Sequence, residues 1–341
     1  MMDAEEGTIA TLCEDYWMPI ANKPSFFIVG APKSGTTALY SYLADHPDIG
    51  MSKGKEPHFF ASDIRGHQRP ATTLAQYLRN FDGAAGKRRI GEASTGYLAS
   101  RKAPQEILAF NPSAQIIVMV RNPIEVMHAM HSQRRFNGCE HITRFELAVD
   151  SWERRYWHSG PFRGEPVLEL SYREITRFSE QLQRYFDVFG RERVHVILFD
   201  DFSSATGIEY GKVLSFLGLR SDGRRSFKVV NDNKRMRSQT VQGWLRNLNA
   251  THPRLKLSFP SLYRGVKAIS SRLNYAHEPR PAMEAGFRRR LEIEYTPEIG
   301  NLGRLLNRNL DHWLAASSPA ILQGAATEFC FSTCPEAQHW S

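Results

Sequence analysis

The chain has 341 residues, of which 41% are hydrophobic, so it can bury a full core in one large α/β domain or in two smaller ones. Its formal net charge of +8 suits a polyanionic ligand, such as a nucleotide, a sulfated glycan, nucleic acid or an acidic membrane, but a generally basic surface explains the charge equally well. The sequence has no arginine–glycine repeats, zinc-finger spacing or RNA-binding signature, which argues against nucleic acid as a partner.

Residues 1–24 are predicted to form an extension before the first strand. They lack the basic region and the apolar run of a signal peptide. No apolar stretch reaches the ~18 residues of a transmembrane helix, so we expect no membrane span and a cytoplasmic protein. Four cysteines in a chain of this length do not make a disulfide framework, although Cys330 and Cys334 are close enough for a local disulfide or a metal clip.

The first predicted strand, Phe26–Val29, is a continuous apolar run of the kind found in buried parallel strands. It leads into a glycine-bearing turn, residues 30–35, which opens a helix predicted over Thr36–Asp45. Backbone N–H groups in such a turn, together with the helix N-terminus, favour an anion, so the segment predicts a phosphate cradle. The side chains that add charge and hydroxyl donors are Lys33, Ser34, Thr36 and Thr37.

This turn differs from a Walker A loop, in which the lysine follows the second glycine and the next hydroxyl binds Mg²⁺. Gly30 and Gly35 keep the glycine spacing, but Lys33 precedes Gly35 and would meet a nucleotide from a different side. A P-loop kinase or another nucleotide phosphotransferase is therefore a hypothesis that the displaced lysine disfavours. A protein that binds a nucleotide without catalysis is a further alternative.

Strands and helices alternate along the rest of the chain, which predicts an α/β fold with a central parallel sheet covered by helices on both faces. Ligands of such sheets bind outside the carboxyl ends of the strands. We predict one domain over residues 25–314 and a weakly ordered tail over residues 315–341. The further strands are predicted at Arg89–Glu92, Gln115–Val120 and Val194–Phe199, and the further helices around Leu74–Leu78 and at Gly211–Leu219, Ala282–Tyr295 and Glu298–Asn307, the last two divided by Pro297.

Two more motifs carry candidate chemistry. Arg121-Asn122-Pro123 closes the strand Gln115–Val120, and its guanidinium suits a phosphate, although a surface arginine is the simpler interpretation of that turn alone. The second motif is Lys55-Glu56-Pro57-His58-Phe59-Phe60. Glu56 is the preferred candidate for a general base and His58 the alternative, whereas the structural interpretations are a glutamate paired with Lys53 or Lys55 and a buried histidine.

The phosphate cradle, Lys-Glu-x-x-Phe-Phe and Arg-Asn-Pro occur here in an order that resembles the sulfotransferases, in particular the bacterial and heparan types, over roughly residues 24–314. The resemblance implies that 3′-phosphoadenosine 5′-phosphosulfate (PAPS) is the sulfuryl donor and that no metal is required. It also implies that Lys33 stabilises the leaving phosphate oxygen, that Glu56 is the base and that Arg121 holds the 3′-phosphate. The residues implied to cradle the 5′-phosphate are Ser34, Gly35, Thr36 and Thr37.

The sequence departs from this family in two places. Ala129 occupies the position where the family usually has a serine that shares the 3′-phosphate, and Ser132 is the candidate substitute, three residues on. Ala93 stands where heparan-type relatives often have a lysine, and Ser94 and Thr95 offer hydroxyls instead.

The acceptor is left open among glycans, small alcohols, phenols and natural products, and so is the oligomeric state. Other candidate groups are assigned to structure rather than to chemistry. His128 and His131 lie three residues apart but lack a third metal ligand in the sequence. An aromatic cluster at helical spacing is expected to pack rather than to stack on a substrate, and its members are Trp152, Tyr156 and Trp157.

Overall fold

A computed structural model describes residues 23–64, 71–137, 139–158, 171–228, 234–236, 275–277 and 280–314, without the side chains of 153–158, 234–236 and 275–277. By its contacts the chain divides into two compact units, residues 1–282 and 283–341, and each is described by itself. The predicted boundaries at residues 24 and 314 stay predictions, and Tyr156, Trp157, Cys330 and Cys334 lie outside the described side chains.

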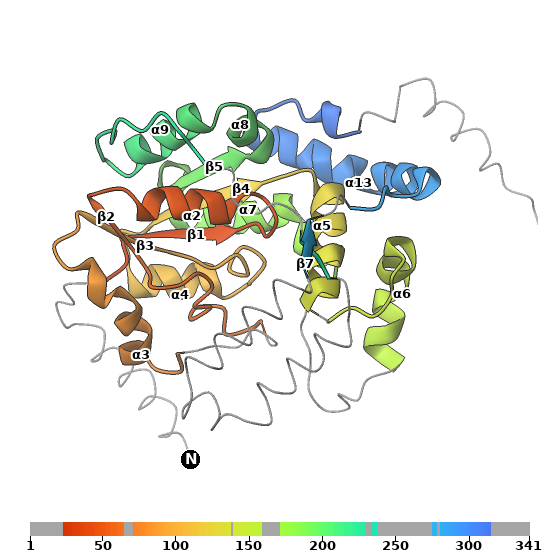
Figure 1. Ribbon diagram of the computed structural model, residues 1–341, viewed down its shortest axis with the longest axis horizontal. Coiled ribbons are helices and arrows are strands. Elements are labelled where there is room, and N and C mark those ends of the chain that lie inside the picture. The colour runs from red at the N-terminus through yellow and green to blue at the C-terminus, as the bar shows by residue number, and fades with distance from the viewer. Residues whose placement is uncertain are drawn as a thin grey trace, which may run out of the picture. The chain divides into compact units, whose positions relative to one another are not determined.

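The first unit is built on a five-stranded sheet in the order β2-β3-β1-β4-β5, in which every neighbouring pair is parallel (Figure 1). The prediction of a central parallel sheet is therefore confirmed. A short antiparallel pair, β6 and β7, forms a second sheet. The strands are β1 (Phe26–Gly30), β2 (Ile49–Met51), β3 (Arg89–Ala93), β4 (Gln115–Val120), β5 (Val194–Leu198), β6 (Lys234–Met236) and β7 (Tyr275–His277).

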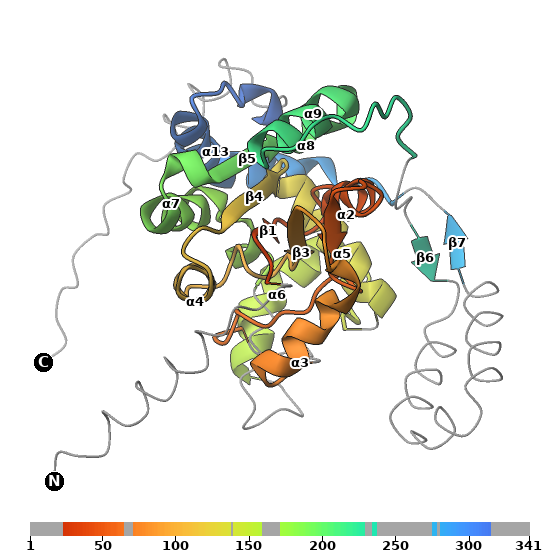
Figure 2. The ribbon, with the colours of Figure 1, turned by 90° about the vertical axis from the view of Figure 1, so that its left-hand side faces the viewer.

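Helices cover both faces of the large sheet (Figure 2). On one face, α2 and α9 bury side chains such as Leu39 and Val213 against Ile28 of β1. Successive residues of a strand point to opposite faces, so Phe27 of β1 packs on the other face, where its ring meets that of Phe60. The helices of this unit are α2 (Thr36–Ala44), α3 (Leu74–Leu78), α4 (Ala103–Phe110), α5 (Pro123–Asn137), α6 (Phe145–His158), α7 (Phe178–Phe189), α8 (Phe199–Ser204) and α9 (Thr206–Phe216).

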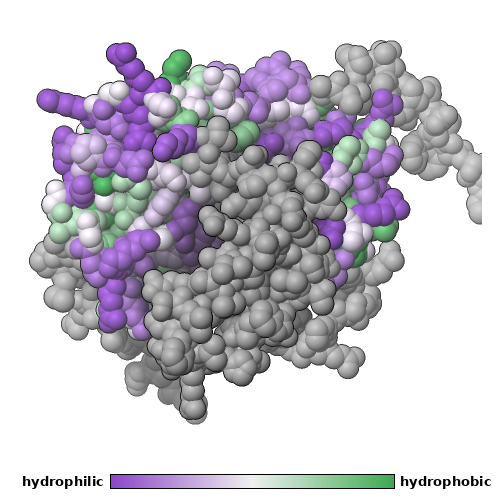
Figure 3. Space-filling view, viewed as in Figure 1, coloured by the Kyte–Doolittle hydropathy of each residue, from purple (hydrophilic) through white to green (hydrophobic). Residues whose placement is uncertain are grey.

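Apolar runs explain why the sheet is buried on both sides. The residues of β1 and Ile116–Val120 of β4 are all buried, because each strand lies between two layers of helices. The surface is different: on the face seen in Figure 3 the described residues are mostly hydrophilic. No helix within the described part of the chain is long and apolar enough to cross a membrane.

The second unit corrects one prediction. Residues 282–307 were expected as two helices divided by Pro297, but α13 runs unbroken over Ala285–Leu306 and contains that proline. A proline inside a helix removes one backbone hydrogen bond, and in the same turn the hydroxyl of Thr296 donates to the carbonyl of Glu292 at 2.8 Å. Glu284, the residue before the helix, caps it: its carboxylate accepts from the N–H groups of Gly286 and Phe287.

Two element ends in the first unit also differ from the prediction. The strand expected over Val194–Phe199 ends at Leu198, and Phe199 begins α8. The helix expected over Gly211–Leu219 begins five residues earlier, at Thr206, as α9. The start of α8 at Phe199 agrees with its composition: Asp200 and Asp201 stand in the first turn of α8, where carboxylates favour a helix start.

Candidate active site

The loops after β1, β4 and β5 meet at one edge of the sheet because parallel strands all end on the same side. In register, Gly30 of β1 lies beside Val118 of β4, and Val120 of β4 lies beside Leu198 of β5. The residue after Val120 is Arg121, whose Nη1 donates to the carbonyl of Lys33 at 3.4 Å. The turn after β1 and the Arg-Asn-Pro turn, which are 88 residues apart, are thus in direct contact.

The turn after β1 has the backbone conformation of an anion cradle. Lys33 and Gly35 both have positive φ, at 61° and 91°, and Gly35 caps α2 without a side-chain hydrogen bond. The first N–H groups of a helix have no partner within the helix, and such groups bind phosphates well. A Cβ at Gly35 would lie 3.2 Å from both Met119 and Phe199, so only glycine fits this approach comfortably.

Lys33 lies among other cations. Its Nζ donates to Gln133 Oε1 at 3.1 Å. The pKa of Lys33 is lowered to about 8, mainly by burial and then, in decreasing order, by the charges of Arg280, Lys55 and Arg121. A bound polyanion would offset these repulsions, so the site is electrostatically suited to a nucleotide that carries several negative charges.

Lys55 connects this cradle to the candidate base. Its Nζ lies 3.2 Å from the hydroxyl oxygens of both Thr36 and Thr37, at the start of α2. The same ammonium lies 3.0 Å from Glu56 Oε1. Of the two structural partners expected for Glu56, Lys55 is present, whereas Lys53 pairs instead with Asp82 at 3.2 Å.

The Glu56 carboxylate is held from several sides. It accepts from the N–H of Thr95 at 2.8 Å and from the hydroxyl of Thr95 at 3.1 Å, and its Oε2 lies 3.3 Å from His58 Nε2. Glu56 and His58 both have a left-handed backbone, with φ values of 65° and 50°. Such conformations cost energy for residues other than glycine, and they concentrate at functional sites.

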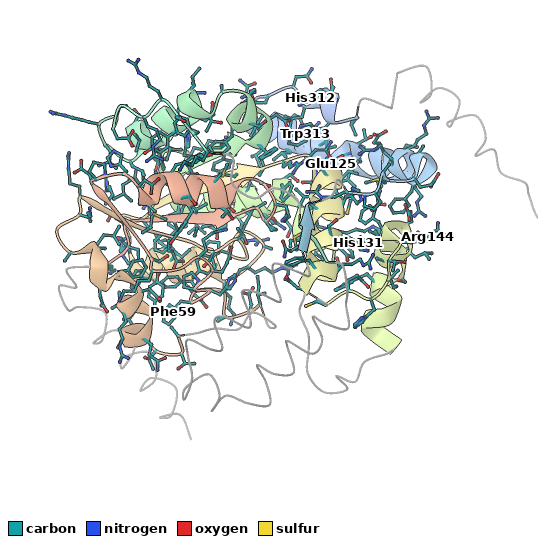
Figure 4. The ribbon with its side chains drawn as sticks, in the orientation of Figure 1. Phe59, Glu125, His131, Arg144, His312 and Trp313 are labelled. Atoms are coloured by element: carbon teal, nitrogen blue, oxygen red, sulfur yellow. The ribbon has the colours of Figure 1, made fainter. Side chains whose placement is uncertain are left out.

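Hydroxyl groups just after β3 hold this segment in place. The N–H of His58 donates to the hydroxyl of Ser94 at 3.1 Å, and the N–H of Phe60 donates to the hydroxyl of Tyr97 at 3.3 Å. Phe59 stacks on Tyr77 with 4.6 Å between the ring centroids, and Figure 4 labels it. The segment that carries Glu56 is therefore anchored along its length.

Ser132, the candidate for the missing serine, is hydrogen-bonded within α5. Ser132 Oγ donates to the carbonyl of His128 at 3.3 Å, one turn back in α5. Gln133 is the side chain of this helix that bonds Lys33. Whether Ser132 contacts a nucleotide stays a prediction. Neither Gln133 nor Arg280 was singled out from the sequence as a binding residue, because neither belongs to a motif.

The two histidines of α5 pack against aromatic rings. His128 and His131 lie 4.9 and 5.6 Å from the ring centroid of Phe145, and Figure 4 labels His131 on α5. Burial is the main cause that lowers the pKa of His131. Trp152 lies under the guanidinium of Arg134, at 4.4 Å. Across the described residues, no group of three or more histidine, cysteine or acidic side chains could hold a metal ion.

Glu92 of β3 is a fully buried carboxyl beneath this segment. Its pKa is raised to about 8, mainly by burial; the hydroxyls of Tyr97 and Tyr77 oppose the shift, and the charge of Glu56 adds to it by a smaller amount. Neither carboxylate oxygen of Glu92 has a hydrogen-bond partner among the residues that the structure describes. Desolvation is therefore the dominant effect, and Glu92 is protonated at neutral pH.

We expect Glu92→Gln to flatten the pH dependence of stability. With a pKa of about 8 in the folded protein and an ordinary value of 4.5, the folded state holds a proton that the unfolded chain has lost. The free energy of unfolding therefore falls as the pH rises from 4.5 to about 8, by about 1.4 kcal/mol per pH unit, and levels off above that range. Denaturant titrations from about pH 5 to pH 9 measure the slope. The control is Glu180→Gln, on the exposed face of α7, which should keep the wild-type slope. Equal slopes for wild type and Glu92→Gln would contradict the raised pKa of Glu92.

A parallel sheet with a phosphate cradle between β1 and α2 defines the class of P-loop-like nucleotide-binding folds. Within that class, the sulfotransferase domain family matches residues 23–251, which is more than half of the chain. The chain therefore belongs to the sulfotransferase family. The family, the fold and the enzyme class predicted from the sequence are confirmed, and the kinase alternative is set aside.

Relatives of known name support the same family. Human heparan sulfate glucosamine 3-O-sulfotransferase 3A1 is 32% identical over 221 residues, covering 64% of this chain and 49% of the relative. Mouse carbohydrate sulfotransferase 15 is 24% identical over 253 residues, covering 58% of this chain and 44% of the relative. The chain thus spans less than half the length of these relatives. A crystal structure of a sulfotransferase from Alicyclobacillus acidocaldarius superposes with a TM-score of 0.62 at 26% identity and covers 85% of this chain and 98% of that one.

Proposed function

We propose that the chain transfers a sulfuryl group from PAPS to a hydroxyl group of a glycan, with Glu56 as the general base. The observation that carries this proposal is the position of Lys55. Its ammonium contacts the two hydroxyls at the start of α2 and the carboxylate of Glu56, so the base lies within one side chain of the phosphate cradle. Sulfuryl transfer needs these two functions side by side.

The donor is proposed to bind by its two phosphate ends. The N-terminus of α2 and the hydroxyls of Ser34, Thr36 and Thr37 would hold the 5′-phosphate. Arg121 would hold the 3′-phosphate, and Arg280 is added to it here because its charge acts on both Lys33 and Arg121. Four cationic side chains act on the cradle, and they suit a donor that carries several negative charges. In this proposal they bind the donor without a metal ion. The four are Lys33, Lys55, Arg121 and Arg280.

In the proposed reaction the acceptor oxygen attacks sulfur, so that a new S–O bond forms while the bond from sulfur to the 5′-phosphate oxygen breaks. The acceptor proton passes to Glu56, and Lys33 stabilises the charge that develops on the leaving phosphate oxygen. His58, the alternative base, has its Nε2 3.3 Å from Glu56 Oε2. We therefore assign it the task of orienting Glu56, because a base needs a fixed direction as well as a suitable pKa.

A glycan is proposed as the acceptor because the named relatives act on heparan sulfate glucosamine and on carbohydrate. A small alcohol or a natural product is the remaining acceptor class. A panel of glycans and small alcohols distinguishes them: the proposal expects label from PAPS on a sugar hydroxyl.

Donor binding is tested with 3′-phosphoadenosine 5′-phosphate (PAP), the product left after transfer. At ~100 times its dissociation constant a ligand adds about 2.7 kcal/mol to stability, so we expect the melting temperature to rise by several degrees in the presence of a chelator. ATP with Mg²⁺ is the comparison. A rise with ATP and Mg²⁺ but none with PAP would overturn the proposed donor.

Arg121→Ala is expected to weaken PAP more than tenfold, because hydrogen bonds to charged groups are worth roughly 1.5–3 kcal/mol. Adenosine 5′-phosphosulfate, which lacks the 3′-phosphate, should lose much less. Ser132→Ala should show the same selectivity more weakly if its hydroxyl replaces the serine missing at Ala129. Paired calorimetric titrations measure both ligands, and equal losses for both would argue against a 3′-phosphate site at Arg121.

A further inference from the structure

Phe199 stands between the two phosphate-binding features of the site. It is the first residue after β5, and the register of β4 and β5 pairs Val120 with Leu198. Arg121 and Phe199 therefore each directly follow the last residue of one of two neighbouring parallel strands, at the same edge of the sheet. No sequence motif connects Arg121 with Phe199, because the two residues are far apart along the chain.

The ring of Phe199 touches both features. The guanidinium carbon of Arg121 lies 4.5 Å from the ring centroid, which is the geometry of a cation–π contact. A Cβ added to Gly35 would lie 3.2 Å from Phe199 Cδ2 and 3.3 Å from Cε2. One aromatic ring thus supports the arginine and also closes against the backbone of the phosphate cradle.

This mode of support suits an arginine that binds a phosphate. A cation–π contact holds the guanidinium by its flat face and leaves the N–H groups on its edge available. Among the residues that the structure describes, the hydrogen bond of Arg121 is a long one of 3.4 Å, to the carbonyl of Lys33. The carboxylates whose charges act on Arg121 are Glu125, in the first turn of α5 and labelled in Figure 4, and Asp200, next to Phe199.

We propose that Phe199 is a positioning residue that sets the Arg121 guanidinium at a fixed place relative to the phosphate cradle, and thereby selects a nucleotide with both a 5′- and a 3′-phosphate. This inference rests on the proposed function, because it assumes that PAP and PAPS bind here. Phe199 itself contacts no phosphate in this account. It acts through Arg121 on one side and through Gly35 on the other.

The test compares Phe199→Leu with Phe199→Tyr by calorimetric titration of PAP and of adenosine 5′-monophosphate, which lacks the 3′-phosphate. Leucine keeps an apolar side chain beneath Gly35 but removes the aromatic face, whereas tyrosine keeps the face. We expect Phe199→Leu to weaken the binding of PAP about tenfold and the binding of the monophosphate less than about twofold. Phe199→Tyr should bind both nucleotides with nearly the wild-type affinity. Melting temperatures of all variants monitor folding.

A double-mutant cycle separates positioning from packing. In an Arg121→Ala background, Phe199→Leu should cause little further loss of PAP affinity, because the residue it supports is gone. Equal losses for both nucleotides, or losses that add in the cycle, would overturn the inference and leave the proposed function intact. A wild-type protein that fails to bind PAP would overturn the proposed function itself.

Discussion

Replacing Glu56 by glutamine is expected to lower turnover by about 10²–10⁴-fold while PAP still binds, because a glutamine keeps the shape but cannot accept a proton. The amide oxygen can still accept from the N–H of Thr95, so the segment should keep its position. Turnover is measured with PAPS and an acceptor at saturation, and PAP affinity by calorimetry.

The matched control is Glu180→Gln, the same chemical change in a side chain that pairs with Arg184 on α7. It should leave turnover unchanged. His58→Asn should lower turnover less than Glu56→Gln, because it disturbs the orientation of the Glu56 carboxylate but keeps that carboxylate as the base. An active Glu56→Gln together with an inactive His58→Asn would show that His58 is the base.

Lys33→Ala is expected to lower kcat by roughly 10²–10³-fold, the usual cost of losing one group that stabilises charge in the transition state. The effect should exceed the loss of PAP affinity, because the leaving oxygen gains charge as the bond to sulfur breaks. Lys53→Ala is the control, since that lysine is exposed and pairs with Asp82. A higher KM for PAPS with an unchanged kcat would mean that Lys33 contributes only to binding.

The parts of the fold that could be predicted are those determined by local sequence. Phe26–Val29 and Gln115–Val120 are continuous apolar runs, and such runs form strands that are buried on both faces. The turn after β1 was predictable because its glycines and hydroxyls act within a few residues of each other. Pro297 shows the limit of local reasoning: it was expected to end a helix, but its neighbours keep α13 unbroken.

The contacts of the site depend on which strands are neighbours, and single residues do not reveal that order. Arg121 reaches Lys33, and Lys33 reaches Gln133, only because β4 lies beside β1. Arg280 is far from Lys33 along the chain, yet its charge lowers the pKa of Lys33. The left-handed backbone of Glu56 is equally hidden from the sequence, because no glycine marks it.

The most direct test of the account follows the sulfuryl group itself. The protein is incubated with PAPS labelled in the sulfuryl group, a panel of glycans and a chelator, and the products are separated and counted. The account predicts label on a sugar hydroxyl, formation of PAP in equal amount, and loss of both with Glu56→Gln. Sulfuryl transfer would be contradicted if the protein binds PAP but moves no label to any glycan or small alcohol. Transfer of phosphate from ATP instead would contradict it as well.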